Sequence, residues 1–335
     1  MTATPELTND EILQQTQYRV YDSLLAAAFC LCLIIGLPGN SLALKYFVGV
    51  KKRSLPTLLY IAACSIDIVS SVIHIPVVIN LVNGRKSGLL EDQNMCLVWY
   101  FVLILVQLLS MFVVMLITLT RAIVINLPFF KISTRAVLIS IFLAVVYFSG
   151  WNVTYFILNE YLYSGETVYC SLQQEEDAKM GFPYMINYLV CSGIPPVIVF
   201  VALVVSIWKL LKTDVTDLSQ RKNHQASVTM IYFAILYLFC NLLTLLNNVL
   251  YTVTQISDKE YDDFYKNHFM NFYSWPMSEV FCTVLNASLN PVLYLYRMKK
   301  MRAWIFGTVR RCKTAVVSSP RSYAITTTNF TVTAQ

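Results

Sequence analysis

The sequence predicts an all-α integral membrane protein: a bundle of seven transmembrane helices with an interfacial amphipathic helix after the seventh. Composition is the first observation, because 57% of the 335 residues are hydrophobic, only 13% are charged, and the mean hydropathy is +0.58. A soluble globular chain usually carries about 25% charged residues. So few charges cannot cover a water-facing surface, and a cytosolic protein is therefore not expected.

Seven apolar stretches provide the second observation, because each is long enough to cross a membrane as a helix of about 20 residues. In chain order they are 22–50, 56–82, 96–127, 135–158, 184–211, 227–256 and 272–296. They are too long and too uniformly apolar for a membrane β-barrel, whose strands alternate over about ten residues. The connections between them are short and polar, so we expect no inserted soluble domain.

The two ends of the chain differ from the spans. Residues 1–21 are polar and acidic, without a basic start or a cleavage site, so the first span is predicted to be an uncleaved signal anchor. After the seventh span, apolar side chains recur at helical spacing and predict an interfacial helix: Met298, Met301, Trp304, Ile305 and Val309. We therefore divide the chain into an extracellular N-terminus (1–21), a seven-helix membrane domain that includes the interfacial helix (22–312) and a cytoplasmic Ser/Thr-rich tail (313–335).

The charge distribution predicts the orientation. Of the 25 lysines and arginines, 18 fall on the side of the first, third and fifth connections and of the C-terminus. Basic residues collect on the cytoplasmic side of a membrane, so the N-terminus is expected outside and the C-terminus inside, in the plasma membrane. Topology and attraction to membrane lipid account for the basic side, and no nucleic-acid partner is expected. Of the 19 acidic residues, 16 lie on the outer side, where they would also attract a cationic ligand.

Polar side chains within the spans are the next feature, because ionisable and amide groups are costly in hydrocarbon and usually serve function there. Five lie at similar predicted depth: Asn40, Asp67, Ser110, Asn286 and Asn290. One carboxylate with several neutral oxygens suits a hard cation, with sodium at Asp67 as the candidate, or a water network. A hydrogen-bonded contact between helices without an ion explains the same pattern, and the spacing does not choose between them.

Several short strings carry a resemblance to a known family. Asn290-Pro291-Val292-Leu293-Tyr294 resembles the NPxxY motif of rhodopsin-like (class A) G-protein-coupled receptors. The family's other marks occur in the expected order: Gly39-Asn40, Asp67, Cys96, Arg121 with Pro128 seven residues later, Trp151, and Pro195 or Pro196. The resemblance covers about 22–312. It implies a seven-helix receptor that binds an extracellular ligand and activates a heterotrimeric G protein.

The cysteines fit this resemblance. Cys96 and Cys170 are the two that we place at the outer side, where an oxidising exterior allows them to form the family's disulfide. Seven others lie in spans or inside, and we expect them to be reduced. Among them, Cys312 follows the interfacial helix and is a candidate for palmitoylation, although an unmodified cysteine is equally compatible.

The resemblance also implies roles in activation. Arg121 would contact the G protein, with Asn290, Pro291 and Tyr294 supporting the open state. Asn40, Asp67, Ser110, Asn286 and Asn290 would form an ion or water site between the ligand and the cytoplasmic face. The tail would be a target for a receptor kinase and arrestin, or a plain solvated tail.

The sequence departs from the family at positions that restrain the inactive state. Thr120 precedes Arg121 where the family usually has an acid, and Asn223 stands where some members have a second acid. This predicts raised basal signalling, unless packing holds the inactive state instead. The sixth span has Asn241 and Leu243 in place of the family's tryptophan and proline. Its Cys240-Asn241-Leu242 string and residues 127–131 are similar to invertebrate peptide and molluscan chemosensory receptors.

Candidate ligand-pocket residues lie near the outer halves of the spans. They are Trp99, Leu103, Gln107, Tyr155, Tyr188, Asn248, Tyr251, Gln255, Tyr273 and Glu279. Leu103 stands where amine receptors have an aspartate, which argues against a monoamine, and the seventh span has no lysine for an opsin's chromophore. Aromatics, amides and one acid suit a peptide or a small polar chemosensory molecule, although Trp and Tyr also collect at membrane interfaces for packing reasons.

Other functions are weighed against this one. A transporter or channel usually shows internal repeats and paired broken spans, which the sequence lacks. No nucleophile–base pair, metal cluster or phosphate-binding loop indicates an enzyme, and no cofactor other than sodium is expected. An uncoupled decoy or scavenging receptor of the same fold is the more serious alternative, because altered motifs at the cytoplasmic side suit it.

Overall fold

The computed structural model describes most of the helical part of the chain. The described residues are 9–51, 53–82, 93–127, 129–158, 161–164, 171–174, 181–212, 228–229, 231–242, 244–246, 249 and 274–307.

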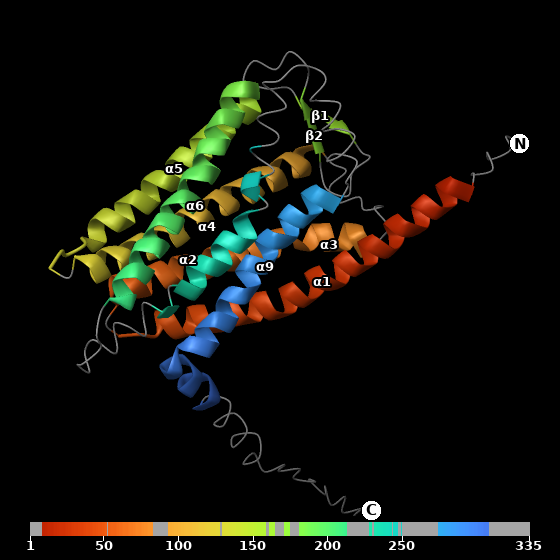
Figure 1. The fold of residues 1–335 in the computed structure, drawn as a ribbon. Coiled ribbons are helices and arrows are strands. Elements are labelled where there is room, and N and C mark those ends of the chain that lie inside the picture. The colour runs from red at the N-terminus through yellow and green to blue at the C-terminus, as the bar shows by residue number, and fades with distance from the viewer. Residues whose placement is uncertain are drawn as a thin grey trace, which may run out of the picture.

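Helices dominate this part of the chain (Figure 1). They are α1 (Asn9–Val48), α2 (Leu55–Ile73), α3 (Ile75–Val82), α4 (Gln93–Asn126), α5 (Thr134–Leu158), α6 (Gly181–Leu211) and α9 (Ser274–Arg297). A helical segment, Ile231–Leu246, lies between α6 and α9 in sequence, and a short helix covers 299–307. Two short antiparallel strands, β1 (Tyr161–Ser164) and β2 (Ser171–Gln174), follow α5, with Tyr161 opposite Gln174.

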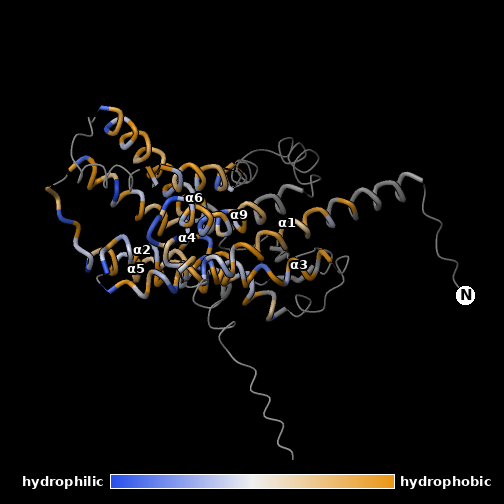
Figure 2. Tube along the Cα trace, turned by 90° about the horizontal axis from the view of Figure 1, so that it is seen from below, coloured by the Kyte–Doolittle hydropathy of each residue, from blue (hydrophilic) through white to orange (hydrophobic). Residues whose placement is uncertain are grey.

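Five stretches are long and apolar enough to cross a membrane: Ser23–Val48, Leu55–Ile79, Leu97–Asn126, Thr134–Thr154 and Ile186–Leu211. They match the first five predicted spans, and large apolar side chains lie exposed along them, as expected of helices in lipid. Apolar colour runs along the helices in Figure 2. The protein is therefore an all-α, multi-pass membrane protein. The segment Ile231–Leu246 is apolar but shorter, and α9 is not among the five, so a total of seven spans stays a prediction.

The helices pack in two groups that share a centre. Helix α1 contacts α2 and α9, whereas α4 contacts α2, α5 and α6. Small residues allow α1 and α9 to approach closely: a Cβ on Gly36 would lie 2.7 Å from the Ser288 hydroxyl oxygen, and one on Gly39 would lie 2.8 Å from the Pro291 ring. Close approach of backbones at glycine is a common basis of helix association in membranes.

The second predicted span, 56–82, is not one continuous helix. It ends as α2 at Ile73 and resumes as α3 at Ile75, with His74 between them. Pro76 is the cause, because proline has no N–H for the carbonyl four residues earlier and its ring clashes with that carbonyl. The Val72 carbonyl accepts the His74 backbone N–H instead.

Side chains complete the hydrogen bonding around this break. The Ser70 carbonyl accepts from His74 Nδ1 at 2.5 Å. The Ile73 carbonyl accepts from the indole N–H of Trp99, on α4, at 2.7 Å. Unpaired backbone groups are costly in hydrocarbon, so these two bonds explain how the break is tolerated there.

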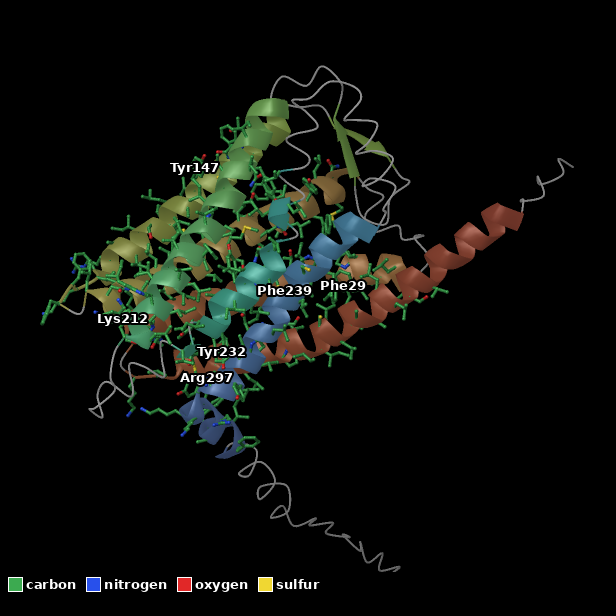
Figure 3. All side chains as sticks on the ribbon, in the orientation of Figure 1. Phe29, Tyr147, Lys212, Tyr232, Phe239 and Arg297 are labelled. Atoms are coloured by element: carbon green, nitrogen blue, oxygen red, sulfur yellow. The ribbon has the colours of Figure 1, made fainter. Side chains whose placement is uncertain are left out.

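The two ends of the bundle differ in charge. The segments 45–60, 119–127, 129–137, 205–212 and 297–307 meet at one end and contain Lys, Arg and no acidic residue among the described positions. We call this the basic end. Figure 3 shows Lys212 and Arg297 there.

The predicted interfacial helix corresponds to 299–307 at the basic end. Its Met301 is fully buried, and its Trp304 ring lies 5.7 Å from that of Tyr46 on α1. The apolar face of this helix therefore packs on the bundle.

Candidate functional site

A buried carboxylate lies at the centre of the bundle, where α2 meets α9. Asp67, 1% exposed, accepts a 2.8 Å hydrogen bond on Oδ2 from the side-chain amide of Asn290. The next turn of α2 is also internally bonded, because the Ser71 hydroxyl donates to the Asp67 backbone carbonyl at 2.8 Å. A carboxylate buried in a membrane bundle requires such a partner, and α9 supplies it.

Asn40 joins α1 to the same region of α9. Its Nδ2 donates to the Ala287 carbonyl at 2.9 Å, and the residue is fully buried. The Ala287 carbonyl lies four residues before Pro291, which cannot supply the usual helical N–H. The Asn40 amide therefore replaces the hydrogen bond that Pro291 removes. We call Asn40, Asp67 and Asn290, with the Ala287 carbonyl, the polar layer.

The other two predicted members are placed differently. Ser110 lies half-buried on α4 and Asn286 lies buried on α9. Within the described part of the chain, no hydrogen bond joins either side chain to Asp67. The structure thus brings together three of the five residues that the sequence placed at one depth.

The polar layer also bears on the predicted sodium ion. The Asn290 amide nitrogen, rather than its oxygen, faces the Asp67 carboxylate, and hard cations bind oxygen. The described residues contain no group of three His, Cys, Asp or Glu side chains that could hold a metal. The Asn40 Oδ1 atom is buried without a hydrogen-bond partner among the described residues, which suits a water donor. The geometry therefore fits a hydrogen-bonded contact, and the sodium ion stays a prediction.

Three aromatic rings surround Tyr294 one turn nearer the basic end. Phe47 and Tyr60 stack at 5.2 Å between ring centroids, and the Tyr294 ring lies 5.5 Å from each of them. Phe233 lies 5.1 Å from Tyr294, so the segment Ile231–Leu246 joins the same cluster. We call Phe47, Tyr60, Phe233 and Tyr294 the aromatic cluster.

The aromatic cluster contains three residues that the sequence analysis missed. Phe47, Tyr60 and Phe233 stand near the ends of predicted spans, where aromatic residues commonly lie at the membrane interface. The structure buries all three instead. The signal that could have identified them is their predicted depth in the membrane, which is similar to that of Tyr294.

Arg121 lies at the basic end of α4 and interacts with the Tyr60 hydroxyl. Its neighbour Thr120 donates its hydroxyl to the Ile117 carbonyl of its own helix at 3.0 Å. In the structure Arg121 therefore lies beside the hydroxyl group of Tyr60 on α2. Asn223, the second position considered in the sequence, lies outside the described residues.

Arg297 connects α9 to the segment that carries Phe233. Its Nε donates to the Thr229 hydroxyl at 3.4 Å, and its guanidinium lies 5.3 Å from the Tyr232 ring centroid (Figure 3). These contacts hold the start of that segment beside the end of α9. Nothing in the sequence distinguishes Arg297 from the many other basic residues at this end.

The predicted ligand-pocket residues are described in part. Trp99 is buried and bonded to Ile73, and Leu103 packs half-buried beside it. The Tyr188 hydroxyl of α6 donates to Gln107 Oε1 of α4 at 3.3 Å, so two predicted residues on different helices meet. The side chains of Tyr155, Asn248, Tyr251, Gln255, Tyr273 and Glu279 lie outside the described residues.

The predicted covalent sites also lie outside the described part of the chain. These are the Cys96 side chain, Cys170, Cys312 and the tail 313–335. The described cysteines are free: Cys30, Cys32, Cys64, Cys191, Cys240 and Cys282. Trp151 is half-buried on α5, and its indole N–H has no hydrogen-bond partner among the described residues.

The fold and this site define a class: an all-α, multi-pass membrane protein whose helices are joined by a buried polar layer. Comparison with models of known protein families gives no match, and comparison with curated proteins gives none either.

Proposed function

We propose that this chain is a rhodopsin-like G-protein-coupled receptor of the plasma membrane. It has seven spans, an extracellular N-terminus and a cytoplasmic basic end. It binds an extracellular ligand, a peptide or a small polar molecule, and activates a heterotrimeric G protein.

The polar layer is the observation that carries this proposal. The sequence selected Asn40, Asp67 and Asn290 by resemblance to three separate motifs of that family. In the structure the three come from α1, α2 and α9, and each pairs through α9 at hydrogen-bonding distance. Buried polar groups need partners in any membrane bundle. The support for a receptor is that residues selected from three separate motifs of the family are the ones bonded to α9 or within it.

The basic end supplies the parts that a transducer needs. Arg121 and Tyr294 both interact with Tyr60, and Phe233 of the sixth predicted span packs on Tyr294. Outward movement of that span would separate Phe233 from Tyr294 and free Arg121 to contact a G protein. The contact between Gln107 and Tyr188 lies nearer the other end, between α4 and α6, and supports a polar ligand there.

A ligand-free nucleotide-exchange assay tests the proposal. The full chain in lipid nanodiscs is mixed with several G-protein types, alongside Arg121→Ala and the control Arg135→Ala, an exposed arginine at the same end. We expect exchange above that of empty nanodiscs, lost in Arg121→Ala and retained in Arg135→Ala. Equal exchange by both variants would contradict coupling through Arg121.

One observation favours the alternative of an uncoupled decoy receptor. Thr120 bonds its own helix and gives Arg121 no charged partner, so the arginine is not held as it is in coupled members of the family. The same assay separates the two functions, because a decoy binds ligand but gives no exchange with any G protein.

A further inference from the structure

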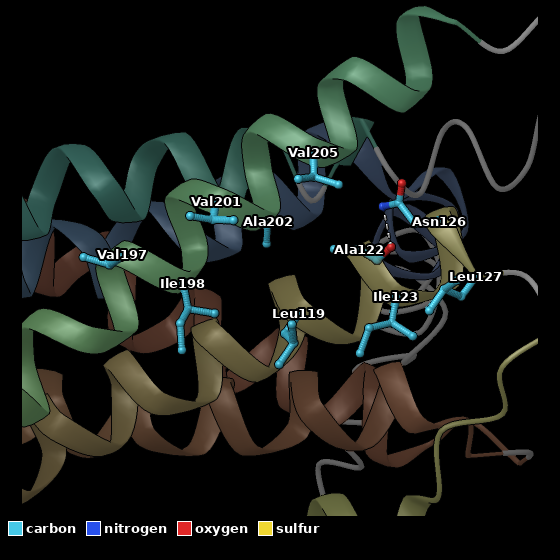
Figure 4. A pocket seen from close by; sticks show the side chains of 10 residues that line it. All are labelled: Leu119, Ala122, Ile123, Asn126, Leu127, Val197, Ile198, Val201, Ala202 and Val205. Carbon is cyan, nitrogen blue, oxygen red and sulfur yellow. Dashed lines mark hydrogen bonds between the residues drawn. The ribbon is translucent and has the colours of Figure 1, made fainter.

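An apolar groove lies on the outside of the bundle between α4 and α6, close to the basic end. It has a volume of about 350 Å³, within the range of small-molecule sites, about 300–1,000 Å³. Ten side chains line it (Figure 4): Leu119, Ala122, Ile123 and Asn126 from α4, Leu127 directly after α4, and Val197, Ile198, Val201, Ala202 and Val205 from α6.

The sequence explains why a hollow forms here. Ala122 on α4 and Ala202 on α6 are both buried and small, so neither helix fills the space between them. Larger residues stand on either side of the alanines. On α6, Val197, Val201 and Val205 recur every four residues and therefore share one face of the helix, where they are exposed.

The chemistry of the lining selects a hydrocarbon chain. Asn126 is the one polar side chain among the ten, and its Nδ2 is occupied by the Ala122 carbonyl at 2.8 Å. A polar ligand would find almost no hydrogen-bonding partner in the groove. Because α4 and α6 are membrane-crossing helices, the surrounding medium is lipid. An acyl chain in the groove gains dispersion contacts on several sides, whereas on a convex helix face it gains them on one.

The charge beyond the groove selects the headgroup. The valine face of α6 continues four residues past Val205 to Lys209, and Lys212 follows directly after the end of α6. Lys212 holds its ammonium 3.9 Å from the centroid of the Trp208 ring, near the end of the helix. Basic residues at a membrane surface attract anionic lipid by about 1 kcal/mol each.

We propose that this groove is a specific site for an anionic phospholipid. One acyl chain lies between α4 and α6 against Ala122 and Ala202, and the headgroup phosphate lies at Lys209 and Lys212. The site does not depend on the receptor function, because it requires only that these helices cross a membrane with their basic end in an anionic leaflet.

Photo-crosslinking of the full chain in nanodiscs tests the acyl-chain half. The probe is phosphatidylglycerol that carries a diazirine near the end of one acyl chain. We expect labelled peptides from 119–127 and 197–205, with labelling competed by unlabelled phosphatidylglycerol but not by phosphatidylcholine. Uniform labelling of all the exposed helix faces would overturn the proposal.

A matched pair of variants distinguishes the groove from the neighbouring surface. Val201 lines the groove and is 54% exposed, whereas Val204 lies on the same helix outside it and is 49% exposed. Val201→Trp fills the groove and is expected to lower labelling of 119–127 by about tenfold. Val204→Trp is expected to leave it unchanged, and both chains should unfold at the same temperature. Equal labelling of the two variants would refute an acyl chain between α4 and α6.

Lysine variants test the headgroup half. Neutralising Lys209→Gln or Lys212→Gln should each lower the preference for phosphatidylglycerol over phosphatidylcholine about fivefold, which is the equivalent of about 1 kcal/mol. Lys299→Gln, on the helix 299–307, is the control and should not change this preference. The assignment of an anionic lipid would be overturned if neither lysine variant changed the preference for phosphatidylglycerol. It would also be overturned if a sterol, and not unlabelled phosphatidylglycerol, competed with the labelling. Crosslinks between two copies of the chain through these peptides, without lipid, would identify the groove as a helix-packing surface instead.

Discussion

The polar layer and the aromatic cluster lie one turn apart but are held together by different forces. The polar layer depends on two hydrogen bonds with fixed donors and acceptors, Asn40 to Ala287 and Asn290 to Asp67. The aromatic cluster depends on four rings at 5.1–6.3 Å, none of which has a single required geometry. Directional bonds in a low-dielectric interior favour one arrangement, whereas ring contacts permit several. The comparison suggests that the basic end can repack while the middle of the bundle stays fixed.

The largest effect is expected in the aromatic cluster. Phe233→Ala would leave a cavity beside Tyr294 and should lower the free energy of unfolding by about 3 kcal/mol. This is the low end of the range for such changes, because the medium around the bundle is already apolar. Phe239→Ala, on the same segment, is the control: Phe233 is 6% exposed and Phe239 is 68% exposed. Thermal unfolding in detergent, followed by dye labelling of the buried Cys64 and Cys240 thiols, measures both variants. Equal destabilisation by the two would show that Phe233 is not packed as described.

A smaller effect is expected in the polar layer. Asn290→Leu removes the donor to Asp67 and should lower the free energy of unfolding by about 2 kcal/mol, the usual contribution of a hydrogen bond to a charged group. The same unfolding assay measures it. The exchanged pair Asp67→Asn with Asn290→Asp reverses the amide and the carboxylate, so it should recover most of the loss. A direct bond between the two side chains would be contradicted if Asn290→Leu left the free energy of unfolding unchanged and the exchanged pair were less stable than the original chain.

The same contrast explains what could be predicted from the sequence. Asp67 and Asn290 were predictable partners because a charge or an amide in a membrane span is rare and has few ways to be satisfied. Phe47, Tyr60 and Phe233 were not, because aromatic side chains are common in spans and nothing in one sequence distinguishes a buried ring from an interfacial one.

The helix break and the groove are two further features that one sequence does not predict, because each depends on contacts between helices. The second span was predicted as one stretch, 56–82, whereas the break at His74 depends on Trp99 of another helix to bond the Ile73 carbonyl. Likewise the groove depends on Ala122 and Ala202 facing each other across two helices. Composition is sufficient to predict a single helix. Features formed by two helices can be identified only when the packing of those helices is known.

The smallest effect tests whether Asn40 acts as a substitute for a missing backbone N–H. Asn40→Ala leaves the Ala287 carbonyl without its donor and should cost about 1 kcal/mol, as for an ordinary buried hydrogen bond. Pro291→Ala restores a backbone N–H four residues after Ala287, and this N–H can donate to the same carbonyl. In the Pro291→Ala background, Asn40→Ala should therefore cost much less than it does alone. A double-mutant cycle in the thermal unfolding assay isolates this coupling from the other effects of each change. Simple additivity would mean that Asn40 stabilises the bundle through packing, and the polar layer would then reduce to the single bond between Asp67 and Asn290.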